Sequence, residues 1–175
     1  MDERPVDVAR RQRLFERIED ELLVLLHGYL KHEPIGMVLM SPSDLELRPG
    51  TVTQPDVFVI PKETTIAGDR MEWSDVKSLL LAVEILSPSS LRTDRVTKRD
   101  FYLANGVEEY WIVDIDARCV ERWTPARETP ELLWEHIVWT PRGRTSLSID
   151  LPTLFDSVDP KRRLGELGVD RNTAS

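Results

Sequence analysis

The chain has 175 residues, of which 41% are hydrophobic and 31% are charged, and this fits one globular domain over residues 1–175 with a core over about 8–156 and a polar tail over about 160–175. Its net charge of −8 argues against a protein that coats nucleic acid through bulk electrostatics, so any DNA contact requires a local basic patch. The apolar runs have the length of strands and the N-terminus is charged, so we expect no membrane-spanning segment and no signal peptide. Cys119 is the single cysteine and has no partner for an internal disulfide, which favours a reducing cytoplasm.

The N-terminal part of the chain predicts one long helix followed by strands. Apolar residues recur at three- and four-residue spacing from about residue 6 to 31, as in an amphipathic helix that lies across a sheet. Pro34 and Gly36 end this helix. A strand over 37–40 follows, and we expect it to return as a second strand over 45–47 after a turn.

Two apolar runs predict the centre of the sheet. Residues 57–60 and 79–86 are too short for helices and too uniformly apolar for edge strands, so adjacent interior strands covered on both faces are expected. A helix over about 93–105, with Gly106 as its C-terminal cap, and a strand over 110–113 follow.

The last part of the chain predicts further strands, over 119–123, 132–139 and 145–151. We expect them to form a C-terminal β-meander that extends the sheet. The elements together predict an α/β fold in which helices flank a mixed central β-sheet.

Two acidic residues in the apolar runs predict a metal site. Asp56 stands at the head of the first run, and Glu84 lies inside the second, where an unpaired carboxylate would cost several kcal/mol. The two carboxylates and the backbone carbonyl of Ile85 are the oxygen ligands that Mg²⁺ or Mn²⁺ prefers. Lys98 could neutralise charge developing on a phosphate, which predicts phosphodiester hydrolysis. A structural ion pair of Glu84 with Lys98 or Arg99 stays open as the alternative.

A basic patch accompanies this predicted site. Eight positions hold four basic residues and one acidic residue: Arg92, Asp94, Arg95, Lys98 and Arg99. Contact with a DNA backbone and a solvated helix face explain such a pattern about equally well.

Four short strings occur in the order and spacing of a known family. They are Gln-Pro-Asp at 54–56, Val-Glu-Ile-Leu-Ser-Pro-Ser-Ser at 83–90, Asp94 followed by Lys98 and Tyr102, and Gly-Val-Glu-Glu-Tyr-Trp-Ile-Val-Asp at 106–114. With these strings the chain resembles the Uma-two family of restriction endonucleases, in the PD-(D/E)XK nuclease superfamily, over roughly residues 8 to 156. The resemblance implies a restriction-endonuclease-like core.

The resemblance also implies roles for individual residues. Asp56 would be the aspartate of the PD element, and Glu84 would be the acidic residue of the (D/E)XK element. Leu86 occupies the position where the superfamily usually has lysine, and by resemblance Lys98 on the following helix replaces it. Superfamily members often add an acidic residue from the first helix, for which Glu16, Glu19 and Glu21 are candidates. We choose Glu19, although a solvated helix face explains all three about as well.

Asp94 and Tyr102 are further supporting candidates, because their spacing from Lys98 places all three on one helix face. The resemblance implies a Mg²⁺- or Mn²⁺-dependent endodeoxyribonuclease. Cutting both strands of a duplex needs two sites, and the Trp-rich strands after Cys119 offer apolar surface for a homodimer interface. The alternative is a catalytically weak or inactive member of the same fold that serves as a binding or assembly module, which the net charge of −8 favours.

Overall fold

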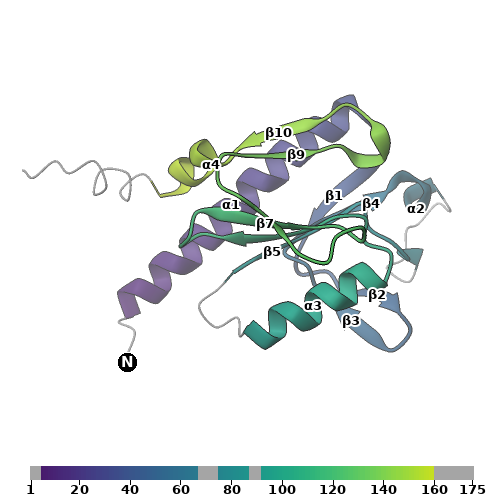
Figure 1. The fold of residues 1–175 in the computed structure, drawn as a ribbon, viewed down its shortest axis with the longest axis horizontal. Coiled ribbons are helices and arrows are strands. Elements are labelled where there is room, and N and C mark those ends of the chain that lie inside the picture. Colours follow the sequence, from purple (N-terminus) through teal and green to yellow (C-terminus); the bar gives the residue numbers. More distant parts are fainter. Residues whose placement is uncertain (1–4, 67–74, 87–91, 160–175) are drawn as a thin grey trace, which may run out of the picture.

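A computed structural model of the protein describes residues 5–66, 75–86 and 92–159. Within these residues, six strands form the main sheet in the order β1-β4-β5-β6-β7-β8 (Figure 1). Their bounds are Gly36–Met40 for β1, Val57–Pro61 for β4, Leu81–Ile85 for β5, Tyr110–Asp114 for β6, Cys119–Trp123 for β7 and Glu131–Leu133 for β8. Strands β5 and β6 run parallel, and the other neighbouring pairs of this sheet run antiparallel. The predicted mixed central sheet flanked by helices is confirmed.

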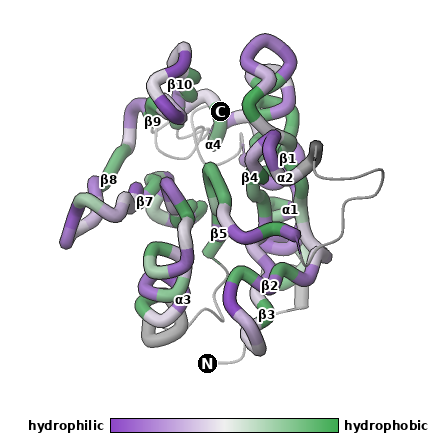
Figure 2. Tube along the Cα trace, turned by 90° about the vertical axis from the view of Figure 1, so that its right-hand side faces the viewer, coloured by the Kyte–Doolittle hydropathy of each residue, from purple (hydrophilic) through white to green (hydrophobic). Residues whose placement is uncertain are grey.

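Strands β4 and β5, two adjacent interior strands, are buried along their whole length. Every residue of β4 and β5 is buried, because the sheet is covered on both faces. In Figure 2 these strands lie between α1 and α3, the helices of opposite faces. The predominantly apolar runs therefore mark interior strands that are covered on both faces.

Helix α1, Pro5–His32, covers the first face of the sheet. Its buried residues Ile18, Leu22 and Leu26 belong to one cluster with inward-facing sheet residues that include Val57, Val83 and Trp111. Helix α4, Leu151–Val158, and a hairpin formed by β9, His136–Trp139, and β10, Leu147–Asp150, complete this layer. The predicted helix over 6–31 is confirmed nearly to its ends.

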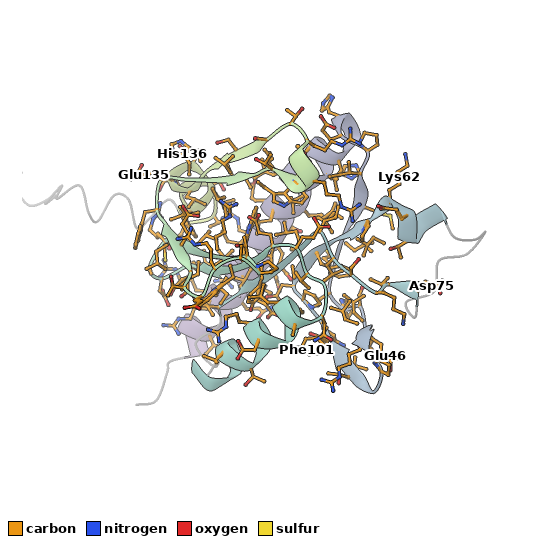
Figure 3. All side chains as sticks on the ribbon, turned by 45° about the vertical axis from the view of Figure 1, so that its right-hand side comes forward. Glu46, Lys62, Asp75, Phe101, Glu135 and His136 are labelled. Carbon is orange, nitrogen blue, oxygen red and sulfur yellow. The ribbon has the colours of Figure 1, made fainter. Side chains whose placement is uncertain are left out.

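Helix α3, Arg92–Ala104, and a hairpin formed by β2, Leu45–Arg48, and β3, Thr51–Thr53, cover the second face. They lie together on the lower side of the sheet in Figure 1, and the labelled Phe101 and Glu46 lie on this same side in Figure 3. Tyr102 is fully buried between α3 and the sheet. Gly106 follows α3 with φ +80, the left-handed conformation that the predicted C-terminal cap requires.

Two predictions about strand pairing and one about the bounds of a strand need correction. Strand β2 pairs with β3 and not with β1, which pairs with β4 instead. The predicted meander extends the sheet through β7 and β8, whereas β9 and β10 form a separate two-stranded sheet. The predicted strand over 145–151 is shorter in the structure, where β10 covers Leu147–Asp150 and Leu151 begins a helix.

Helix α4 was not predicted from the sequence. The side chain of Asp150 accepts a hydrogen bond from the backbone N–H of Thr153 at 2.7 Å, which caps the helix, and Pro152 stands in the first turn, where its missing N–H costs nothing. Arg10 on α1 pairs with Asp159 at 2.6 Å and so fixes the other end of α4 against α1.

Among the described residues, no helix combines the length and the apolar character needed to cross a membrane. A short helix, α2, Lys62–Ile66, follows β4. The predicted polar tail over 160–175 lies outside the described residues, and the single domain over 1–175 stays a prediction.

Candidate functional site

Asp56 and Glu84 lie opposite each other on adjacent strands. Val57 pairs with Val83 in the β4–β5 ladder, and continuing this register by one residue places Asp56, which directly precedes β4, across from Glu84 of β5. Side chains alternate between the faces of a strand, so both carboxylates project from the second face, beneath α3. Directly opposed residues have Cβ atoms about 4.5–5.5 Å apart, which brings the two carboxylates within reach of one cation.

Glu84 is held by two side chains of α3. The ammonium group of Lys98 donates to its Oε2 at 2.9 Å, and the hydroxyl of Tyr102 donates to its Oε1 at 2.8 Å. Lys98 and Tyr102 are four residues apart, one turn on the same helix face. Glu84 is 8% exposed, so these contacts provide the compensation that a buried carboxylate requires.

Asp56 is fixed by the backbone. Its Oδ2 accepts a hydrogen bond from the N–H of Ile85 at 2.6 Å, and its own carbonyl accepts from the N–H of Ser41 at 3.0 Å. A strand residue directs its N–H and its C=O towards the same neighbouring strand, so the carbonyl oxygen of Ile85 faces the side of Asp56. The role of this Ile85 carbonyl oxygen as a metal ligand stays a prediction.

The site concentrates negative charge in a buried place. The pKa of Asp56 is raised to about 7, mainly by burial and further by the charge of Glu84, while the Ile85 N–H and Lys98 oppose the shift. Burial, followed by the charge of Asp56, also raises the pKa of Glu19 to about 7. Glu19 is 8% exposed on α1, so this helix brings a third carboxylate into the electrostatic reach of Asp56. A bound cation would relieve this repulsion.

Tyr102 stays a hydrogen-bond donor at this site. Burial, followed by the charge of Glu84, raises the pKa of its hydroxyl far above the ordinary value, so the group remains a neutral phenol. Its oxygen also lies 2.8 Å from the Oγ1 of Thr53 on β3. Thr53 was not selected from the sequence, because a threonine in a short polar strand gives no signal of such a contact.

The donor set fits a hard divalent cation. Mg²⁺ is commonly held by one or two carboxylates and keeps several waters, and Asp56 and Glu84 supply that number of carboxylates. Among the described residues, no group of three or more His, Cys, Asp or Glu is placed to hold a metal ion together. Glu19 interacts with Asp56 through its charge.

Of the remaining candidate residues, the structure describes the side-chain contacts of Arg99 alone. Arg99 stacks its guanidinium 4.6 Å from the centre of the Trp123 ring and pairs with Asp100, so part of its binding capacity is used within the protein. The side chains of Arg92, Asp94 and Arg95 lie outside the described residues, although their backbone belongs to α3. Contacts of Arg92, Arg95 and Arg99 with nucleic acid stay predictions.

Comparisons with known proteins show the fold and the family of the chain. The chain has the fold of a solved structure from Anabaena variabilis described as a "putative nuclease belonging to DUF820", with a TM-score of 0.67, 22% sequence identity and coverage of 83% of this chain and 82% of that chain. A family model described as "Putative restriction endonuclease" matches residues 2–153. The chain belongs to this family, Uma2, which supports a nuclease as the class of protein and confirms the predicted family. A comparison with curated proteins gave no match.

Proposed function

We propose that the chain is a divalent-metal-dependent endonuclease that hydrolyses phosphodiester bonds of DNA. The observation that carries this proposal is the opposition of Asp56 and Glu84 on one face of adjacent central strands, with the Lys98 ammonium bound to Glu84. Membership in the Uma2 family supports the reaction class.

Asp56 and Glu84 would hold Mg²⁺ or Mn²⁺, with the Ile85 carbonyl as a further oxygen ligand. When bound, the metal would polarise a phosphate oxygen and lower the pKa of a bound water. Lys98 would orient that water or neutralise the charge that develops on phosphorus, and its 2.9 Å contact with Glu84 keeps it at the site before substrate arrives.

The other candidates have supporting roles in this proposal. Glu19 adds negative charge beside Asp56, and Asp94 on α3 lies one turn before Lys98. Arg92, Arg95 and Arg99 would contact the DNA backbone and offset the net charge of −8 locally. We place this activity in the cytoplasm, as composition and the single cysteine suggest.

One observation favours a second function. Glu84 is neutralised by Lys98 and hydrogen-bonded by Tyr102 in the protein alone, so its contacts are also those of a structural ion pair. An inactive member of the fold that serves as a binding or assembly module would keep such a pair. Incubating supercoiled plasmid DNA with the protein and Mg²⁺ or Mn²⁺ separates the two functions: metal-dependent cleavage that EDTA abolishes supports the nuclease, and intact plasmid supports the binding module. A parallel incubation with RNA tests the choice of substrate.

Metal affinity is expected to rise with pH. Asp56 must be deprotonated to bind a metal, and its pKa lies at about 7. The pKa of Glu19, which adds charge beside Asp56, also lies at about 7. Mn²⁺ affinity should therefore increase between about pH 6 and about pH 8, by up to about tenfold per pH unit below the pKa for each proton released. Calorimetric titration at about pH 6 in two buffers of different ionisation enthalpy should show proton release on binding. A pH-independent affinity would contradict the assignment of these carboxylates.

The stability of the metal-free protein should change in the opposite direction. The pKa of Asp56 is raised from 3.8 to about 7 on folding, so the folded state binds more protons than the unfolded state within this window. The melting temperature without metal should therefore fall as the pH rises from 3.8 to about 7, the two pKa values of Asp56. Mn²⁺ should oppose this fall, because the cation compensates the ionised carboxylate.

The protein is further proposed to act as a homodimer. Strand β8 is an outer strand of the main sheet, and Leu132, Trp134 and Val138 expose 46%, 52% and 42% of their surface. Leu132 lies on β8, Trp134 directly follows this strand and Val138 lies on β9. Exposed apolar side chains of this kind are suited to a two-fold interface. Light scattering at high micromolar concentration should give the mass of a dimer, and Trp134→Glu should reduce it to that of a monomer. A monomeric wild-type protein would make nicking of single strands the expected chemistry.

A further inference from the structure

We infer that Thr53 and Tyr102 are positioning residues that hold the carboxylate of Glu84 in place through two consecutive hydrogen bonds. The inference rests on the proposed function, because it states how this chain prepares a carboxylate for a cation. Thr53 belongs to β3, Tyr102 to α3 and Glu84 to β5, so three separate elements meet in this contact.

The distances define a chain of contacts. The Tyr102 hydroxyl lies 2.8 Å from the Oε1 of Glu84 and 2.8 Å from the Oγ1 of Thr53. Tyr102 is fully buried and its ring also packs against Tyr110, with the ring centres 5.0 Å apart. The hydroxyl therefore has a fixed place, and water does not compete for its contacts.

The donor and the acceptor of each of the two hydrogen bonds follow from the number of hydrogen atoms on the hydroxyl groups. A phenol hydroxyl carries one hydrogen, and an ionised carboxylate can only accept, so the Tyr102 hydrogen is used on Glu84. The second contact then requires the hydroxyl of Thr53 to donate to the Tyr102 oxygen. Thr53 acts on Glu84 through Tyr102, because its bond fixes the hydroxyl in the orientation that donates to the carboxylate.

This arrangement determines how Glu84 presents its two oxygens. Oε1 receives the Tyr102 hydrogen bond, while Oε2 faces Lys98 at 2.9 Å. A carboxylate held at one oxygen loses its rotational freedom, so the other oxygen is oriented before a cation arrives. Thr53 also lies three residues before Asp56, so the β2–β3 hairpin is linked both to Glu84 and to the chain that carries the other carboxylate.

Mn²⁺ affinity, measured by calorimetry on the full chain, tests the inference. Tyr102→Phe should weaken binding about 10–100-fold, the usual effect of removing a partner that orients a metal ligand. Thr53→Val should weaken binding in the same direction, and Thr53→Ser, which keeps the hydroxyl, should retain the wild-type affinity. In the Tyr102→Phe background, Thr53→Val should add no further loss, because its effect passes through the absent hydroxyl.

Two control variants separate positioning from general damage to the fold. Tyr29→Phe removes another phenol hydrogen bond, the 2.7 Å bond to the Thr145 carbonyl, and should leave Mn²⁺ affinity unchanged even if it lowers the melting temperature. Thr51→Val makes the same change as Thr53→Val at an exposed position of the same strand, and should also leave the affinity unchanged.

The outcomes distinguish this inference from the proposed function. Mn²⁺ binding that depends on Asp56 but is unaltered in Tyr102→Phe overturns the positioning role and leaves the proposed function intact. Additive losses in the double variant overturn the relay through Tyr102. If the wild-type protein shows no Asp56-dependent binding of Mn²⁺, the proposed function fails and the inference fails with it.

Discussion

Replacing Asp56 by Asn is expected to abolish both the stabilisation of the protein by Mn²⁺ and DNA cleavage. At a Mn²⁺ concentration of about 100 times the dissociation constant, the wild-type protein should gain about 2.7 kcal/mol in its free energy of unfolding. Asn cannot supply the negative charge that the cation requires, although its amide oxygen can still accept the 2.6 Å hydrogen bond from Ile85. Thermal melts with and without Mn²⁺ measure the first effect, and plasmid cleavage measures the second.

The metal-free form of this variant provides a check on the sign of the effect. Ionised Asp56 is unfavourable in its buried place, since burial raises its pKa to about 7. At about pH 8 the metal-free Asp56→Asn protein should therefore be at least as stable as the wild type. Asp150→Asn is the matched control, because Asp150 also accepts a backbone N–H, at 2.7 Å, but at the exposed start of α4. An equal response to Mn²⁺ in the wild type and in Asp56→Asn would show that the cation binds elsewhere.

Replacing Lys98 by Ala is expected to lower cleavage by about 10²–10³-fold while the fold and metal binding survive. The ammonium group would act mainly when charge develops on phosphorus, so its loss affects the transition state more than the ground state. The side chain of Lys98 is 39% exposed, so water can partly replace its contact with Glu84. The loss of stability should therefore stay below the about 3–5 kcal/mol typical of breaking a fully buried pair.

Melting temperature and cleavage measured on the same Lys98→Ala sample separate the catalytic from the structural role. Lys31→Ala, which changes an exposed lysine at the end of α1, serves as the control and should alter neither quantity. A large loss of stability with little specific loss of cleavage would make Lys98 the structural partner of Glu84. Unchanged cleavage in a well-folded Lys98→Ala protein would make Arg95 or Arg99 the next residue to test.

Elements with one strong periodicity or one uniform environment could be predicted from the sequence. The spacing of Ile18, Leu22 and Leu26 predicts α1 because a helix on a sheet buries one face. The apolar runs of β4 and β5 predict adjacent interior strands because both faces of these strands are covered. Elements of three residues, such as β3, carry too few side chains for a pattern.

Strand pairing depends on close approaches that composition does not reveal. A Cβ atom on Gly36 would lie 2.3 Å from the carbonyl oxygen of Ile60, so glycine lets β1 approach β4 at this point. Strand β1 accordingly pairs with β4, and β2, which follows it after the turn, is not its partner. Similarly, β10 runs directly into α4 without a loop, so the sequence pattern does not separate Leu151, the first residue of the helix, from the end of the strand.

Some residues of the candidate site could likewise be predicted from the sequence, whereas others could not. Asp56 and Glu84 could be chosen from the sequence because a charge at the head of an apolar strand or inside one requires a partner. A basic partner for Glu84 on the following helix could be expected from charge, with Lys98 and Arg99 both open, and the structure pairs Glu84 with Lys98. The charge interaction of Glu19 with Asp56 depends on how α1 crosses the strand ends, and the contact of Thr53 with Tyr102 depends on how the hairpin meets α3. No local pattern encodes these distances.

A crystal of the protein soaked with Mn²⁺ tests the central claim most directly, because anomalous scattering locates the ion without reference to activity. We predict one Mn²⁺ within about 2.0–2.6 Å of carboxylate oxygens of both Asp56 and Glu84, and no such ion in crystals of Asp56→Asn. An ion bound away from this pair, or a wild-type site without Mn²⁺ at a concentration that supports cleavage, would contradict the account.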